Sequence, residues 1–201
     1  MFTGIIEAIG EVQQKTALGL VLSRPKNFDD LKLGSSVSVS GVCLSVTKLT
    51  SSSMSFSVVS ETWKRTSFKN LKKGDQVNLE RSVSQRGRFE GHFVQGHTED
   101  TARVASITKE KKQTTLVLKI PKHLINAIIP KGSIAVDGVS LTVASIKGSR
   151  CTIALIPHTL SHTTLGLLKK GDVVNIETDM MIRAFLWNQK TKSRRIKPLK
   201  R

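Results

Sequence analysis

The chain has 201 residues, 38% of them hydrophobic, with two cysteines and a formal net charge of +17. Two cysteines exclude a disulfide framework, and no apolar run approaches the roughly 18 residues that a membrane span needs. Because the N-terminus also lacks the basic region and cleavage site of a signal peptide, we expect a reduced, cytoplasmic protein without a membrane anchor.

The first half of the chain is predicted to form short strands separated by turns. Strands are expected at 2–12, 18–22, 36–49, 54–59 and 76–80, with a turn at 25–33 and a short helical segment at 60–70. In the third of these strands, Val37 and Val39 face one way and the intervening serines the other, which is typical of a half-buried strand. Residues 82–90 are polar and rich in Arg and Gly, so we interpret them as a linker.

The second half repeats this order. Strands are expected at 114–120, 133–146, 151–156 and 172–178, and short helices at 121–129 and from Pro157 onward. Beyond Asp179, apolar residues spaced as on one face of a helix predict a terminal helix that packs on another subunit, namely Met181, Ile182, Phe185 and Leu186.

The last residues carry much of the positive charge. Seven basic residues fall there without aromatic residues among them for base stacking: Lys190, Lys192, Arg194, Arg195, Lys197, Lys200 and Arg201. We interpret this segment as a solvated basic tail and expect no nucleic-acid partner. A basic β-barrel that binds nucleic acid is the alternative, and steeply salt-dependent binding would identify it.

The two halves are copies of one unit. The run Gly41-Val42-Cys43-Leu44-Ser45-Val46 recurs 97 residues later as Gly138-Val139-Ser140-Leu141-Thr142-Val143, and the same separation relates Glu80 to Glu177. A repeat of this length predicts two domains, residues 1–90 (with the linker) and 91–179, followed by a helix and tail at 180–201. Many short strands with glycine turns predict an all-β fold, closed or sandwiched.

Several kinds of chemistry find no support in the sequence. His92 and His97, and likewise His158 and His162, lack partners at a usual metal-ligand spacing, and no phosphate loop, dinucleotide fingerprint or nucleophile elbow is present. We therefore expect neither a metal nor a cofactor.

What remains is a related pair of polar clusters, which predicts two copies of one ligand: Cys43, Ser45, Thr62 and Thr66 in one half, Ser140, Thr142, Thr159 and Thr163 in the other. The alternatives are that Cys43 is only a small buried hydrophobe and that His97 is structural.

Five motifs together closely resemble the riboflavin synthase family of alpha-chain type. They are Met1-Phe2-Thr3-Gly4-Ile5-Ile6, the two repeated runs above, Gly91-His92-Phe93-Val94-Gln95-Gly96-His97, and Ile156-Pro157-His158-Thr159-Leu160. The resemblance implies two tandem six-stranded antiparallel Greek-key barrels, a homotrimer held by C-terminal helices, and no cofactor. It also implies a transferase that converts two 6,7-dimethyl-8-ribityllumazine molecules into riboflavin and 5-amino-6-(D-ribitylamino)uracil. Association with lumazine synthase is a further expectation, and a non-enzymatic lumazine- or flavin-binding antenna protein is the alternative.

The resemblance also implies site residues. It assigns a catalytic part to Ser36, Cys43, His97, Ser140, Thr142 and Asp179. It places the first barrel's pocket on Gly4, Ile5, Ile6, Cys43, Leu44, Ser45, Ser57, Val58, Val59, Ser60, Glu61 and Thr62. It places the second barrel's pocket on Gly96, His97, Thr98, Val139, Ser140, Leu141, Leu155, Ile156, Pro157, His158, Thr159 and Leu160, with Lys131 contributed by a neighbouring chain.

For the reaction itself, His97 is the expected base, relayed by Ser140 or Thr142 through water, and Cys43 assists at the acceptor ring. Because the predicted linker is short, we expect the productive site to form between the first barrel of one chain and the second barrel of another.

Overall fold

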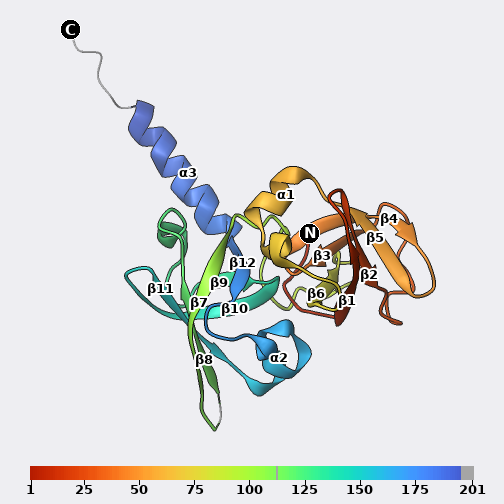
Figure 1. Cartoon of the computed structure of the whole chain (residues 1–201). Coiled ribbons are helices and arrows are strands. Elements are labelled where there is room, and N and C mark those ends of the chain that lie inside the picture. Colours follow the sequence, from red (N-terminus) through yellow and green to blue (C-terminus); the bar gives the residue numbers. More distant parts are fainter. Residues whose placement is uncertain (112, 196–201) are drawn as a thin grey trace.

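The computed structural model describes residues 1–111 and 113–195, with side chains as far as Gln189. Its strands form two closed antiparallel barrels of six strands each, one after the other along the chain (Figure 1). The first barrel has the strand order β1-β2-β5-β4-β3-β6 and the second β10-β11-β8-β7-β12-β9. The predicted all-β fold of two tandem six-stranded barrels is therefore confirmed.

The strands of the first barrel are β1 (Ala8–Lys15), β2 (Gly19–Ser23), β3 (Ser36–Val39), β4 (Val42–Leu49), β5 (Ser53–Ser57) and β6 (Gln76–Arg81). Those of the second are β7 (Asp100–Lys109), β8 (Thr114–Lys119), β9 (Ser133–Val136), β10 (Val139–Lys147), β11 (Arg150–Leu155) and β12 (Val173–Thr178). Each barrel closes around its own apolar core, so the two copies of the repeat each form a separate hydrophobic core.

Short helices connect β5 to β6 and β11 to β12 in the same way in both barrels. They are α1 (Ser60–Arg65) with the 3₁₀ helix η1 (Ser67–Asn70), and α2 (Pro157–His162) with η3 (Thr164–Leu167). The helix expected at 121–129 is only the single turn η2 (Ile125–Ala127). The predicted terminal helix is present as α3 (Met180–Arg195) and projects away from both barrels (Figure 1).

The repeated motif is a hairpin rather than the continuous bent strand expected at 36–49 and at 133–146. Strands β3 and β4 are joined by Ser40 (φ 42°) and Gly41 (φ 80°), and β9 and β10 by Asp137 (φ 45°) and Gly138 (φ 79°). Two consecutive residues with positive φ form the type I′ turn that the twist of a hairpin requires, and Gly suits its second position. The alternation in the first half was thus correct, but the glycine reverses the chain.

These two turns are where the barrels meet. A Cβ on Gly41 would lie 2.7 Å from the backbone nitrogen of Gly138, so only glycine allows this backbone contact. On either side, Asn78 donates to the carbonyl of Asp137 (2.9 Å), and its repeat counterpart Asn175 donates to the carbonyl of Ser40 (2.8 Å). Each barrel therefore binds the other's hairpin through a buried amide, and the contacts follow the pseudo-twofold of the repeat.

Asp137 makes the stability of this junction depend on pH. Its Oδ1 accepts from the Asn175 N–H, and burial raises the pKa of Asp137 from 3.8 to about 7. Because the folded state favours the protonated acid, this group's contribution is full below about pH 4 and is lost as pH rises through 7. Asp137→Ser, which copies Ser40, is expected to remove that share of the pH dependence. The test measures the urea midpoint of unfolding for the wild type and for Asp137→Ser between pH 5 and 8. If the midpoints of the two proteins changed with pH in the same way, the prediction would be wrong.

Candidate active site

Two segments outside the barrels, residues 1–7 and 91–99, run between them and build the site. They pair with each other, since the Phe2 N–H donates to the Val94 carbonyl (2.8 Å) and the Val94 N–H to the Phe2 carbonyl (3.1 Å). Residues 2–7 were expected to continue the first strand, but β1 begins only at Ala8. The free backbone of this stretch bonds to the other segment instead.

Each segment ends against the barrel that it does not lead into. The Gly4 carbonyl accepts from the Ser140 N–H of the second barrel (2.8 Å), and the Gly96 carbonyl accepts from the Cys43 N–H of the first (2.7 Å). The family resemblance implied that Gly4, Ile5 and Ile6 belong to the first pocket and Gly96, His97 and Thr98 to the second. The hydrogen bonds instead join Gly4 to Ser140 of the second barrel and Gly96 to Cys43 of the first, so the two segments are exchanged between the barrels.

Two buried carboxylates hold the segments in place. Glu80 on β6 accepts from the N–H groups of Thr3 (2.7 Å) and Gly4 (3.0 Å), while Glu177 on β12 accepts from those of Gln95 (2.7 Å) and His97 (2.9 Å). Burial raises the pKa of Glu80 to about 6 and also raises the pKa of Glu177, although the backbone donors oppose the shift. The carboxylates therefore position the backbone of the site.

The first half-site lies around Cys43. A cavity of about 230 Å³ is lined by Cys43 on β4, by Glu61 and Thr62 on α1, and by Gly96, His97 and Thr98. His97 pairs with Val42 through a β-bridge, and the Thr98 hydroxyl donates to the Gly41 carbonyl (2.9 Å). Cys43 is half-buried at this cavity rather than enclosed in the barrel core, so it is not merely a small core hydrophobe.

The second half-site lies around Ser140, the repeat counterpart of Cys43. Here the Ser140 hydroxyl lies 2.7 Å from Nδ1 of His92, a residue that our sequence prediction missed. His92 is 9% exposed, and burial lowers its pKa, with the charge of Asp179 acting in the opposite direction. Its Nε2 has no partner among the described residues. His97, the expected base, contacts the first half-site instead of Ser140.

Several side chains assigned to the pockets point into the barrel cores. They are no more than 9% exposed and pack in the two core clusters, so only their backbone can face a ligand: Leu44, Val58, Val139, Leu141 and Leu155. In contrast, Ile5, Val59 and Ile156 expose their apolar side chains by 42%, 68% and 57%. Leu44, Val139 and Leu141 occupy the inward-facing positions of their strands, whereas Ile5, Val59 and Ile156 lie outside the strands, where no barrel core covers them.

The hydroxyl groups of the predicted polar clusters divide into two kinds. Thr66 and Thr163 are buried and directly precede η1 and η3. Their hydroxyls donate to the carbonyls of Thr62 in α1 and Thr159 in α2. These two threonines are structural. Two hydroxyl residues to which the resemblance assigned a catalytic part lie in strand pairs. Ser36 lies opposite Ser45 in the β3–β4 pair, and Thr142 lies opposite Ser133 in the β9–β10 pair.

The remaining predicted site residues lie at the ends of elements. Asp179 immediately precedes α3, and its Oδ1 accepts from the Met181 N–H (2.8 Å). Exposed Lys131 lies in the turn before β9. Ser57 ends β5 and Ser60 begins α1; in the second barrel Pro157, His158, Thr159 and Leu160 belong to α2. Among the described residues, no three His, Cys, Asp or Glu side chains gather as metal ligands. None of the described helices is long and apolar enough to cross a membrane.

Comparisons with known proteins agree with this arrangement. The model of the lumazine binding domain matches twice, at residues 3–82 and 95–179. The riboflavin synthase of Bacillus amyloliquefaciens is 42% identical over 185 residues, which cover 90% of this chain and 86% of that protein. The riboflavin synthase of Escherichia coli (strain K12) is 36% identical over 190 residues, or 92% and 89% of the two chains.

Solved structures of LumP have the same fold. The riboflavin complex of LumP superposes with a TM-score of 0.82 at 28% identity, covering 89% of this chain and 99% of that one. The complex with 6,7-dimethyl-8-(1'-D-ribityl) lumazine gives 0.79 at 29% identity, with the same coverage. Two matches to the domain model, together with relatives aligned along most of the chain, show that this chain belongs to the riboflavin synthase family of proteins with two lumazine-binding domains.

Proposed function

We propose that the chain catalyses the riboflavin synthase reaction, in which one 6,7-dimethyl-8-ribityllumazine transfers a four-carbon unit to another. The products are riboflavin and 5-amino-6-(D-ribitylamino)uracil. One observation carries the proposal: the two half-sites have the same construction but different reactive groups. Cys43 lies beside Gly96 and His97 in one, and Ser140 beside Gly4 and His92 in the other. Two identical substrates that play different parts need such a pair of sites.

Much of the rate is expected to come from holding two ring systems in one orientation. The exchanged segments suit this task because their backbone is fixed by Glu80 and Glu177 rather than left as mobile loops. The exposed side chains of Ile5, Val59 and Ile156 offer apolar surface for the flat faces of the rings. Hydroxyl and backbone groups at the strand ends supply polar partners for the ring edges and the ribityl chain.

Proton transfer is assigned to the Ser140–His92 pair. The reaction removes a proton from a ring methyl group and later returns one, so a group must both accept and donate. Burial lowers the pKa of His92 and so favours its neutral form, which can accept a proton through the Ser140 hydroxyl that it contacts. In the other half-site, Cys43 assists addition at the acceptor ring, and His97 contacts that ring.

We also propose that the chain acts as a homotrimer through α3 in the cytoplasm. A further part of the proposal is that this trimer associates with lumazine synthase. Met181 and Phe185 on α3 are 64% and 62% exposed, which leaves apolar area for a partner helix. Both cysteines are free, as a reducing compartment would keep them. We propose that Lys131, which lies at an exposed turn, contributes to the site of a neighbouring chain.

Turnover of the lumazine tests the function. Incubation should form riboflavin and the uracil product in equal amounts from two substrate molecules, followed by absorbance and chromatography. Ser140→Ala is expected to lower kcat by about 100-fold, the lower end for loss of general acid–base catalysis. Ser145→Ala on the same strand is the matched control and should keep full activity. Tight binding of lumazine without any riboflavin formation would favour a ligand-carrying protein instead; LumP has been solved in complex with both compounds.

A further inference from the structure

Four basic residues stand in a row across the second barrel. Register pairs Arg103 with Lys119, Lys119 with Arg150, and Arg150 with Lys147, on the neighbouring strands β7, β8, β11 and β10. All four are exposed, and among the described side chains none forms an ion pair with them. Like charges directly opposite each other destabilise a sheet, so this row weakens the barrel that carries it.

The fold does not require the row. The same positions of the first barrel, matched by strand register, are occupied by Glu11, Ser23, Ser53 and Thr50. That barrel closes equally well with one acid and three hydroxyl residues. The repeat is thus an internal control, and it shows that the cations belong to the second barrel alone.

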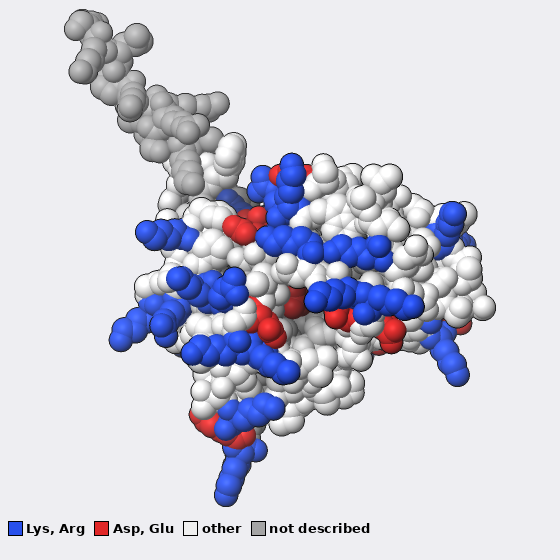
Figure 2. Space-filling view, viewed as in Figure 1, with Lys and Arg blue, Asp and Glu red and all other residues white. Residues whose placement is uncertain are grey.

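The row continues to a groove between the barrels. The Arg103 guanidinium donates to the Gly171 carbonyl (2.6 Å), in the turn that carries Lys169 and Lys170. A groove of about 630 Å³ lies between this turn and its counterpart in the first barrel, which carries Lys72 and Lys73. Figure 2 shows basic side chains in rows on both sides of a central hollow, with acidic side chains between them.

The two acids of these turns are already bound. Asp75 and Asp172 lie in the groove, and each accepts from a backbone N–H of its own turn, that of Lys72 or Lys169, at 2.7 Å. They fix the turns that carry the lysines. The lysine ammonium groups of both turns therefore remain for a ligand.

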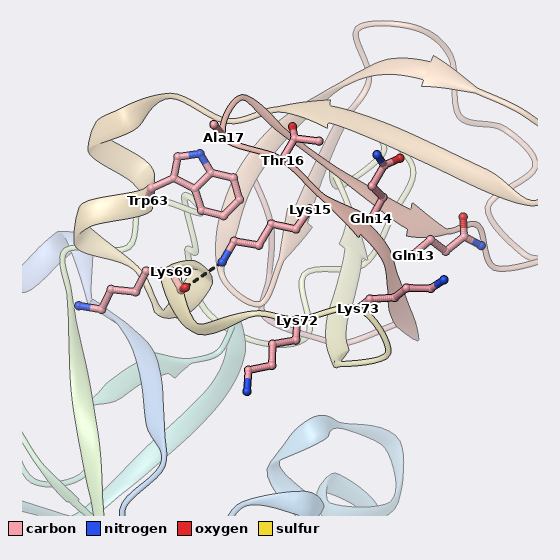
Figure 3. A pocket seen from close by; sticks show the side chains of 9 residues that line it. All are labelled: Gln13, Gln14, Lys15, Thr16, Ala17, Trp63, Lys69, Lys72 and Lys73. Atoms are coloured by element: carbon pink, nitrogen blue, oxygen red, sulfur yellow. Dashed lines mark hydrogen bonds between the residues drawn. The ribbon is translucent and has the colours of Figure 1, made fainter.

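Across the groove, a tryptophan stands among the cations (Figure 3). A cavity of about 640 Å³ is lined by Trp63, by four lysines and by four uncharged residues, and none of the described residues in its lining is acidic. The lysines are Lys15, Lys69, Lys72 and Lys73. Lys15 Nζ lies 5.2 Å from the centre of the indole ring and donates to the carbonyls of Lys69 and Leu71. The corresponding residues of the second barrel are Leu160 and Ile107, so this feature too is absent from the other copy.

We propose that this face binds the backbone of single-stranded nucleic acid without sequence preference. The cations of both barrels form a track for phosphates. Trp63 is half-buried against Phe68 and has Lys15 over its ring, so the exposed part of the indole beside Lys15 is what a base can stack on. The row itself lacks apolar anchors of the kind that dominate contacts with folded proteins. Our sequence interpretation expected no nucleic-acid partner because the basic tail has no aromatic residue, and it kept a nucleic-acid-binding barrel only as the alternative. Folding brings Trp63 to Lys15 and Lys69, which lie far from the tail in the sequence.

The test uses the full chain and a labelled oligodeoxythymidylate of about 16 nucleotides. Fluorescence anisotropy measures the affinity from about 50 to 200 mM salt, over which binding should weaken steeply. Lys119→Gln/Arg150→Gln should reduce the slope of log K against log salt by about 1.4, since each phosphate contact to a single strand contributes about 0.7. Lys32→Gln/Lys48→Gln removes the same charge from exposed positions of the first barrel that line neither the groove nor the Trp63 cavity, and it should leave the slope unchanged.

Two further measurements separate stacking from general attraction. In Trp187→Phe, Trp63 is the single tryptophan, so its fluorescence should be quenched by the oligonucleotide. Trp63→Leu, which copies Leu160, should weaken binding about tenfold. The proposal would be overturned if the two double variants lost the same affinity for the oligonucleotide, or if the wild type did not bind it at about 50 mM salt. Displacement by polyglutamate at equal phosphate and carboxylate concentrations would assign the face to an acidic polypeptide instead. Circular dichroism confirms folding independently of lumazine turnover.

Discussion

Replacing Gly96 by alanine is expected to lower kcat/KM for riboflavin formation by at least about 100-fold, because misplacement of a reacting group by about 1 Å costs that much. Gly96 has φ +75°, and a Cβ there would lie 2.7 Å from the Cβ and 2.9 Å from the nitrogen of Cys43. The segment must therefore move off β4, which breaks the bond between the Cys43 N–H and the Gly96 carbonyl and carries His97 away. Steady-state kinetics measure the loss, and circular dichroism shows whether both barrels persist.

Gly74→Ala separates the clash from backbone strain. Gly74 also has positive φ (+90°), but a Cβ there would meet nothing within 4 Å. This variant should lose about 1–2 kcal/mol of stability and keep its activity. Gly4→Ala should behave like Gly96→Ala, since its Cβ would lie 2.7 Å from Ser140. If Gly74→Ala and Gly96→Ala lost activity alike, the packing of the segment against Cys43 would not be what matters.

The division into two similar domains was predictable because the repeated motifs recur at a constant separation of 97 residues. The hydrophobic alternation and the glycine turns then predicted the strands and the all-β class. The hairpins at Ser40-Gly41 and Asp137-Gly138 were misread, since a glycine within a β-branched run is compatible with either a bend or a reversal. Only the pairing of β3 with β4 and of β9 with β10 decides between them.

The sequence points to residues that the structure brings together, but it does not show how they are grouped. Cys43 and Ser140 stand out as the differing members of one motif. The exchange of the segments around Gly4 and Gly96 cannot be read from sequence, because each bonds to a strand of the other barrel. For the same reason His92 was missed, since its partner Ser140 is 48 residues away. The motif Gly91-His92 was the available signal.

The terminal helix is connected to the first half-site through Arg183. Its Nη2 donates to Oε1 of Gln95 (2.6 Å), and Nη1 lies 3.7 Å from Glu99, so both partners flank His97. Burial raises the pKa of Glu177, which holds the His97 backbone, and the Arg183 charge opposes that rise. The helix that we propose as the contact with another subunit is thus joined to residues of the site, which is how the oligomer would act on the site.

Mixing two inactive chains is expected to restore activity. Cys43 and His97 lie in the same half-site, so a complementing pair must take one residue from each: Cys43→Ala and Ser140→Ala. If the productive site joins the first half-site of one chain to the second half-site of another, some mixed oligomers contain an intact pair. Random assortment of equal amounts gives about a quarter of such pairs intact, whereas neither parent has any.

The measurement is riboflavin formation before and after subunit exchange, with exchange followed by mass spectrometry of differently tagged chains. Wild-type chain mixed with Cys43→Ala is the control for dilution and should show activity in proportion to its intact pairs. A site formed within one chain predicts the opposite result, because Cys43→Ala and Ser140→Ala would each carry one damaged half. Confirmed exchange without recovery would therefore place both half-sites in a single chain and remove the need for α3 in catalysis.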